Sequence, residues 1–166
     1  MKLYVVRHAL AEDTAAGGDE ARHLTDVGRQ RTLKAAAGMQ ALGLELDLIL
    51  TSPLARAFET AEIIAGVYAN GLVPQVAREL ATGISAPDAV AALAPHSRND
   101  SLMIVGHEPQ LSALVSILLT GEPDMIHLRM RKGACVALEL PPHRIEPSAA
   151  ELHWMMSQRQ LRKLRA

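Results

Sequence analysis

Short apolar runs alternate with longer amphipathic stretches along this chain of 166 residues. Such runs are typical of buried strands, and the stretches between them are typical of helices. Strands that alternate with helices form β-α-β units, which build a largely parallel sheet covered on both faces. We therefore expect one α/β domain over residues 1–166, with three α/β/α layers and a mostly parallel central sheet. The predicted strands are residues 3–7, 47–51, 73–77, 101–105, 134–140 and 151–155, the last two as antiparallel additions.

Helix signals separate these runs. Thr25 is a favourable N-cap and Gly43 a favourable stop, so the two bracket one predicted helix. Ser52 and Pro53 fit the N-cap and the first helical position of a second helix, which we expect to end near Asn70. The predicted helices cover residues 25–42, 52–70, 85–93, 109–119 and 157–165.

The charge balance argues against a general nucleic-acid binder. Lys and Arg total 17 against 18 acidic residues, a formal net charge of −1, whereas such binders carry a basic patch or stripe. The first apolar run is too short for a signal peptide and ends at Arg7. The longest later apolar stretch, residues 111–119, is far below the roughly 20 residues that span a bilayer. We expect a cytoplasmic protein that binds neither nucleic acid nor membrane.

The chain has one cysteine, Cys135. A single cysteine excludes an intrachain disulfide and a zinc site built from several thiolates. Because Cys135 lies within an apolar run, we expect it to be a small buried core residue rather than a nucleophile. The histidines show no metal-ligand spacing, and no glycine-rich nucleotide loop is present. We expect no metal and no cofactor.

Charged side chains follow four of the predicted strands. Arg7 and His8 come at the end of the first strand, Arg56 lies one turn into the helix after the second, Glu79 follows the third, and His107 follows the fourth. Ligand sites in parallel sheets lie outside the carboxyl ends of the strands. Each residue alone is weak evidence, but together they place two arginines and two histidines where one anion would bind.

Phosphoryl transfer is the chemistry that needs two arginines and two histidines around one point. Arginine forks match phosphate oxygens, and prearranged donors stabilise the charge on the transferring group. Helix N-termini after Ser52 and Gly106 would point their dipoles at the same anion. A histidine flanked by arginines is pushed toward its neutral form, which leaves a ring nitrogen free to attack. One histidine is then the nucleophile and the other a donor to phosphate.

Four motifs in order resemble the histidine phosphatase superfamily, the phosphoglycerate-mutase-like fold. Residues 3–9 (LYVVRHA) are similar to its Arg-His-Gly signature, and residues 22–28 (RHLTDVG) to its Leu-Thr-x-x-Gly segment. Residues 47–57 (DLILTSPLARA) are similar to its Ser-Pro-x-x-Arg-Ala segment, and residues 105–109 (VGHEP) to its Gly-His segment. The short length and the Gly-His-Glu-Pro form most resemble SixA-type phosphohistidine phosphatases.

The resemblance implies a role for each residue of the predicted rim. His8 would be the nucleophile that becomes a phosphohistidine intermediate. Arg7, Arg56 and His107 would hold the phosphoryl oxygens. Glu79 falls where many members carry the acid that protonates the leaving group, although an exposed glutamate after a strand is otherwise an ordinary surface residue.

Four further positions bear on this resemblance. Glu12 and Glu108 are lesser candidates for the acid, and Glu108 is better explained as support for its helix N-terminus. Ala9 stands where the signature has glycine, so its methyl group is expected to narrow the approach to phosphate. Glu59 stands where glutamine is frequent, and we expect only a local effect.

The segments that could cover the site are short. Residues 77–87 form a short link, and residues 121–133 form the one sizeable late loop. We therefore expect a shallow, open site that takes a phosphorylated protein, such as a histidine phosphotransfer domain, or a small phosphomonoester. Arg129, Arg131 and Lys132 could face an acidic partner or simply be solvated. The alternatives are a small-molecule phosphatase or mutase on the same scaffold, and a silent phosphoprotein-binding module that would not need His8.

Overall fold

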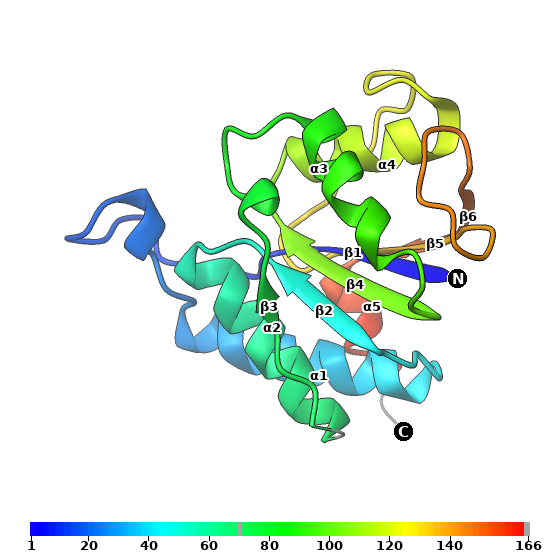
Figure 1. Ribbon diagram of the computed structural model, residues 1–166. Coiled ribbons are helices and arrows are strands. Elements are labelled where there is room, and N and C mark those ends of the chain that lie inside the picture. Colours follow the sequence, from blue (N-terminus) through cyan, green and yellow to red (C-terminus); the bar gives the residue numbers. More distant parts are fainter. Residues whose placement is uncertain (70, 165–166) are drawn as a thin grey trace.

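A six-stranded sheet forms the centre of the computed structural model, which describes residues 1–69 and 71–164 (Figure 1). Its strand order is β3-β2-β4-β1-β5-β6. The strands are β1 (Lys2–Arg7), β2 (Leu48–Thr51), β3 (Gln75–Val76), β4 (Ser101–Gly106), β5 (Cys135–Glu139) and β6 (Glu151–Met156). β1, β2, β3 and β4 are parallel, β5 pairs antiparallel with β1, and β6 pairs antiparallel with β5. The expected α/β class and the antiparallel late strands are confirmed.

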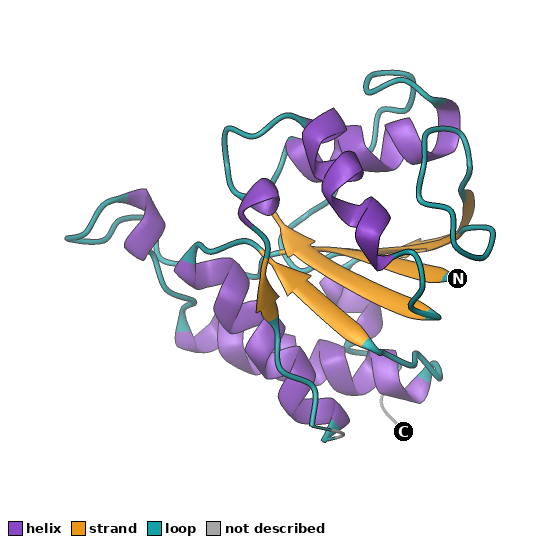
Figure 2. Ribbon diagram, viewed as in Figure 1, coloured by secondary structure: helices purple, strands orange, loops and turns teal. Residues whose placement is uncertain are grey.

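Helices cover both faces of this sheet (Figure 2). α1, α2 and α5 lie on one face, and α3 and α4 lie on the other. The α-helices are α1 (Asp26–Ala41), α2 (Ala55–Tyr68), α3 (Ala86–Leu93), α4 (Gln110–Thr120) and α5 (Gln158–Leu161). Three short 3-10 helices are η1 (Asp19–Ala21), η2 (Arg78–Leu80) and η3 (Ala94–His96).

β1 shows why the strands have continuous apolar sequences. Leu3 and Val5 belong to the core that packs on α3 and α4, whereas Tyr4 and Val6 belong to the core that packs on α1 and α2. Alternate side chains of a strand point to opposite faces. Because both faces are covered, all four residues are buried, and each such side chain contributes about 1.5–3 kcal/mol.

The N-cap signals of two helices are confirmed. Thr25 accepts a hydrogen bond from the backbone N–H of Gly28 at 3.0 Å, and Ser85 accepts one from Asp88 at 3.2 Å. Gly28 is required for a different reason: a Cβ atom there would collide with the carbonyl oxygen of Leu10. This contact packs the start of α1 against the chain that follows β1.

The prediction that Ser52 caps α2 is wrong. The helix begins at Ala55, with Leu54 as its N-cap and no capping side chain. Ser52 instead accepts a hydrogen bond from the backbone N–H of Leu54 at 3.3 Å and contacts His107. α2 ends at Tyr68, and the predicted end at Asn70 lies outside the described residues.

Two terminal or edge elements are shorter than predicted. β3 has two residues instead of the predicted 73–77, because this edge strand pairs only with the end of β2 and leaves Val73 73% exposed. The last helix ends at Leu161, whereas the prediction reached Arg165, which lies outside the described residues. No helix within residues 1–69 and 71–164 is long and apolar enough to cross a membrane.

Candidate active site

The carboxyl ends of β1, β2 and β4 meet at one edge of the sheet. Arg7 pairs with Gly106 in the parallel register, and the backbone N–H of His8 donates to the carbonyl of Gly106 at 3.0 Å. The backbone N–H of Ser52 donates to Val105 at 2.9 Å. These bonds bring together the three predicted motif segments that follow the strands.

His8 is a neutral histidine with one free nitrogen. Its Nδ1 lies 2.8 Å from the carbonyl oxygen of Ala9, and a carbonyl can only accept, so Nδ1 carries the proton. Nε2 therefore keeps its lone pair. Burial, together with the charges of His107, Arg56 and Arg7, lowers the pKa of His8 to about 3, despite the opposing effect of the Ala9 bond. An unprotonated Nε2 at neutral pH is what a nucleophile requires.

His107 lies beside His8, with the two ring centroids 5.1 Å apart. Its Nε2 is 2.8 Å from Ser52 Oγ, and its Nδ1 is buried with no hydrogen-bond partner among the described residues. Burial and then Arg56 lower the pKa of His107 to about 4, with Asp19 acting in the opposite direction. Ser52 thus fixes one side of the ring, and Nδ1 on the other side has no partner among the described residues.

Arg7 and Arg56 each donate hydrogen bonds from terminal nitrogens of the guanidinium group. Arg7 donates from Nη1 to the carbonyl of Met130 at 2.8 Å. Arg56 donates from Nη1 to the carbonyl of Asp19 at 2.6 Å and from Nη2 to its carboxylate at 2.8 Å. The Nε of each arginine is buried and has no partner within the described chain.

Three predicted site residues therefore share one property: a buried nitrogen without a partner. These atoms are Arg7 Nε, Arg56 Nε and His107 Nδ1. A buried donor left unpaired costs about 1–3 kcal/mol. An oxyanion bound beside His8 would supply acceptors for them, and the arginines would supply its counter-charge. The arrangement can hold a tetrahedral oxyanion next to a neutral histidine.

Residues 12–23, which we call the arm, project from the edge of the sheet (Figure 1). Ala11 and Leu24 close its base as an isolated antiparallel bridge. Within the arm, the Glu12 carboxylate accepts from the backbone N–H of His23 at 3.2 Å. The arm carries η1, and through Asp19 it reaches Arg56.

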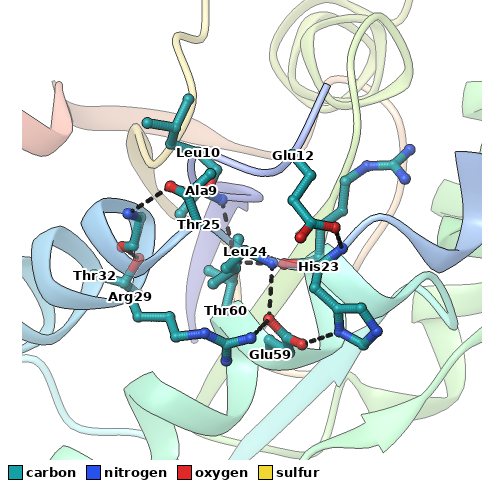
Figure 3. Close-up of polar contacts among 12 residues, drawn as sticks. Ala9, Leu10, Glu12, His23, Leu24, Thr25, Arg29, Thr32, Glu59 and Thr60 are labelled. Atoms are coloured by element: carbon teal, nitrogen blue, oxygen red, sulfur yellow. Dashed lines mark hydrogen bonds and ion pairs between the residues drawn. The ribbon is translucent and has the colours of Figure 1, made fainter. Parts of the chain in front are cut away.

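Glu59 of α2 anchors the base of the arm (Figure 3). Its carboxylate accepts from the backbone N–H of Leu24 and from Arg29, both at 2.9 Å, and it contacts Nδ1 of His23. Burial raises the pKa of Glu59, but these three partners outweigh burial and the net shift is downward. The glutamate that replaces the family's frequent glutamine is thus an ion-pair partner.

Ala9, which stands where the signature that this chain resembles has glycine, is a buried residue beneath the arm. Ala9 is fully buried in a small cluster with Ala11 and Leu24, and its backbone N–H donates to Thr60 Oγ1 at 3.1 Å. The methyl group packs with the two residues at the base of the arm, and the expected narrowing of the phosphate approach stays a prediction.

The carboxylate candidates for an acid lie in three different settings. Glu79 is exposed in η2, and its carbonyl accepts from the Gln110 side chain at 2.8 Å, which ties η2 to the start of α4. Glu108 accepts from the backbone N–H and the hydroxyl of Ser112, so it supports the helix N-terminus as expected. Glu12 is engaged within the arm. The acid role of Glu79 stays a prediction.

A groove of about 470 Å³ lies beside His107. It is lined by residues 82–86 on one side and by residues 107–110 with Asp124 on the other. A second hollow of about 290 Å³ shares Pro109 and Asp124 with the groove and reaches Arg129. A ligand bound at the two histidines can therefore extend along the surface toward the late loop.

Three groups at the site have no counterpart in our sequence prediction. The Met130 carbonyl and the Asp19 side chain come from segments without periodicity, so only their tertiary contacts reveal them. Ser52 was visible in the Ser-Pro motif, but the local capping signal concealed its contact with His107. Arg129 and Arg131 are exposed and flank the buried Met130 in the sequence. Because the Met130 carbonyl binds Arg7, this part of the late loop lies close to Arg7.

Cys135 is a core residue, as expected. It is fully buried, and burial raises the pKa of its thiol above the ordinary range. In the part of the chain that the structure describes, no three His, Cys, Asp or Glu side chains gather as a metal site would require.

Comparisons with known proteins agree with this geometry. A profile of the histidine phosphatase superfamily (branch 1) matches residues 3–81. An uncharacterized protein of Picosynechococcus sp. is 37% identical to this chain over 152 residues, which cover 88% of this chain and 89% of that protein.

Solved structures share the whole fold. The protein histidine phosphatase SixA complexed with tungstate has a TM-score of 0.83 and 25% identity, covering 97% of this chain and 99% of that one. The alpha-ribazole phosphatase from Shigella flexneri has a TM-score of 0.74 and 19% identity, covering 95% and 97%. A phosphoserine phosphatase from Entamoeba histolytica has a TM-score of 0.69 and 18% identity, covering 96% and 98%.

The family profile covers the segments that carry Arg7, His8 and Arg56, and the structural likeness to SixA covers 97% of this chain. The four motifs, the fold and the profile therefore agree. The chain belongs to the histidine phosphatase superfamily and is a phosphatase of that family.

Proposed function

We propose that this protein removes a phosphoryl group from phosphohistidine on another protein, through a covalent intermediate on His8. The observation that carries the proposal is the state of His8: Nδ1 is committed to the Ala9 carbonyl, and Nε2 retains its lone pair in a buried, neutral ring. The unpaired nitrogens of Arg7, Arg56 and His107 support an oxyanion beside it.

The first step transfers the phosphoryl group to the enzyme. The lone pair of His8 Nε2 forms a bond to phosphorus, and the bond between phosphorus and the substrate nitrogen breaks. The electron pair of that bond stays on the leaving imidazole, which takes up a proton. Arg7, Arg56 and His107 bind the phosphoryl oxygens, whose charge must be stabilised in the transition state.

The second step releases phosphate. A water oxygen forms a bond to phosphorus, the bond between phosphorus and His8 Nε2 breaks, and Nε2 recovers its electron pair. The water proton passes to solvent or to the group that protonated the leaving imidazole. The Nδ1–Ala9 bond keeps the ring in one tautomer throughout, so the same nitrogen serves in every cycle.

Glu79 is the proposed donor of the leaving-group proton. Its backbone carbonyl is bound by Gln110, so η2 lies against the start of the helix that follows His107, which supports this role. Glu79→Gln should lower kcat about 10- to 100-fold on an alkyl phosphate ester, whose leaving group needs a proton. Aryl esters, with better leaving groups, should lose much less, and equal losses on both would remove Glu79 from this role.

The open surface supports a protein substrate. The groove beside His107 continues into the second hollow, which reaches the exposed Arg129. A folded partner can present a phosphorylated side chain to His8 while its surface lies along these hollows. The SixA structure, that of a protein histidine phosphatase, holds tungstate, a tetrahedral oxyanion like phosphate.

A small phosphomonoester is the second candidate substrate. The groove of about 470 Å³ beside His107 has the size of an ordinary small-molecule site. The reaction at His8 would be unchanged, with an alcohol oxygen as the leaving group. Solved relatives of the same fold include phosphatases for alpha-ribazole phosphate and phosphoserine.

A substrate panel tests the proposal. Phosphate release is measured from a phosphorylated histidine phosphotransfer domain and from a series of small phosphomonoesters, with His8→Ala as the blank. We expect kcat/KM to be at least about 100-fold higher for the protein substrate. A preference for one small ester would assign the activity to metabolite hydrolysis. Absence of His8-dependent release from every substrate would favour a phosphoprotein-binding module.

A further inference from the structure

The arm makes a contact with Arg56 that the proposed reaction does not use. The Asp19 carboxylate and carbonyl accept from Nη2 and Nη1 of Arg56, which are the two terminal nitrogens of the guanidinium. Nε of Arg56, on the other edge of the group, is buried and has no partner in the described chain. Asp19 therefore binds both terminal nitrogens of Arg56 and leaves Nε without a partner in the described chain.

The Asp19 carboxylate also lies between two arginines. One oxygen accepts from Arg56 and the other accepts from Arg22 at 2.6 Å. The bonds from Arg22 and Arg56 lower the pKa of Asp19, so it is negatively charged at neutral pH. Its charge is felt within the site, because it opposes the effect of Arg56 on His107.

The burial of the two partners is very unequal. The Arg56 side chain is 4% exposed, whereas the Asp19 side chain, in η1 of the arm, is 56% exposed. Arg56 lies in α2 among buried neighbours, whereas Asp19 has solvent on one side. The contact can therefore weaken or re-form without disturbing the core.

We propose that Asp19 is a positioning residue that sets the affinity of the site for phosphate. It holds Arg56 in place, and its negative charge offsets part of the positive charge that a phosphoryl group meets. The inference rests on the proposed role of Arg56 in binding phosphoryl oxygens. Free phosphate, which brings no other contacts, is then bound weakly and leaves quickly after the reaction. A protein-borne phosphoryl group compensates through contacts along the groove.

Binding of inorganic phosphate tests this proposal directly. The dissociation constant is measured by calorimetry for the wild type, for Asp19→Asn and for Glu20→Gln. Asparagine keeps the volume and one acceptor oxygen, so it removes the charge together with one of the two arginine bonds. Glu20→Gln removes the same charge from the neighbouring exposed residue of η1 and is the matched control.

We expect Asp19→Asn to bind phosphate about three- to tenfold more tightly, as removal of a partly screened charge predicts. Glu20→Gln should change the constant by less than about 1.5-fold. The KM of Asp19→Asn for a small ester should fall with the phosphate constant. A purely structural role would not raise affinity, so this direction distinguishes the two. Unchanged or weaker binding in Asp19→Asn would overturn the inference, and so would equal gains in both variants.

Arg56→Ala separates this inference from the proposed function. If Arg56→Ala binds phosphate as tightly as the wild type, Arg56 does not hold phosphate and the proposed function loses one of its groups. If Arg56→Ala weakens binding but Asp19→Asn does not strengthen it, only the role of Asp19 fails.

Discussion

The two sides of the site are built by different means. The sheet edge carries His8 and His107 on strand ends joined by backbone hydrogen bonds, and both side chains are buried. The arm faces them with the exposed Asp19 and is held at its base by one bridge and by Glu59. The comparison shows which groups must keep their geometry. The histidines that we propose to meet the phosphoryl group follow the paired strands, and the residue that we propose to adjust its affinity lies on the arm.

The largest expected effect is at the sheet edge. His8→Ala removes the nitrogen that would bond to phosphorus, so kcat should fall by about 10⁴-fold or more. The acid-labile phosphoenzyme, trapped by rapid quench with radiolabelled substrate, should disappear as well. A variant that retains more than about 1% of wild-type activity would show that another group is the nucleophile.

Alanine variants of Arg56, beside the sheet edge, and of Arg22, on the arm, compare the contributions of the two regions to kcat/KM. Arg56→Ala should lower kcat/KM about 100- to 1000-fold, because a prearranged donor to the transition state is lost. Arg56→Lys should recover only part of this, since lysine lacks the fork. Arg22→Ala, on the arm, should change kcat/KM less than about fivefold. Comparable losses for both alanine variants would mean that the arm binds the transition state directly.

The protonation of the two site histidines should differ from that of ordinary histidines. Both pKa values are lowered, so the neutral rings should persist as pH falls from 8 to 5. Their imidazole NMR signals, assigned with His8→Asn and His107→Asn, should therefore not move over this range. Midpoints near 6.5 would contradict the buried, cation-flanked environment. By linkage, the unfolded chain takes up these protons first, so both histidines favour unfolding as pH falls below about 6.5.

The smallest effect is expected at the anchor of the arm. Glu59→Gln keeps the shape but removes the charge that pairs with Arg29 and His23, so the free energy of unfolding should fall by about 1–2 kcal/mol. Thermal unfolding should move down by about 2–8 °C, and kcat/KM should stay within about twofold. Because the pKa of Glu59 is lowered, its contribution is present near neutral pH and is lost as pH falls through that pKa.

Glu62→Gln provides the control for this change. Glu62 is exposed on the same helix, and its charge change should leave the melting temperature within about 1 °C. Equal shifts in the two variants would assign the loss to the net charge of α2, and a large loss of activity in Glu59→Gln would make the arm part of the chemistry.

The sheet edge was predictable from the sequence, and the arm was not. Apolar runs that end in Arg7-His8 and Gly106-His107 locate strands, and parallel pairing then brings their ends together. Residues 9–24 have no such periodicity, so nothing in them indicates that Asp19 reaches Arg56. The position of the arm depends on two tertiary contacts. Gly28 packs against Leu10, and Glu59 binds the backbone of Leu24.

Local signals also failed where a tertiary partner competed with them. Ser52 before Pro53 is a favourable start for a helix, but its hydroxyl is used by His107 and the helix begins three residues later. Val73 has the composition of a strand, yet the edge position gives it no pairing partner. In both cases the residue has the expected intrinsic preference, but its tertiary surroundings give it a different structure.

The position of β1 has a consequence for how the protein is made. β1 lies between β4 and β5, so Lys2 pairs with Ser101 on one side and with Glu139 on the other. While the chain is being synthesised, the strand that leads to His8 has no neighbour until those later segments leave the ribosome. Catalytic competence should therefore arise late and all at once, and fragments that end before Ser101 should expose both edges of β1 and tend to aggregate.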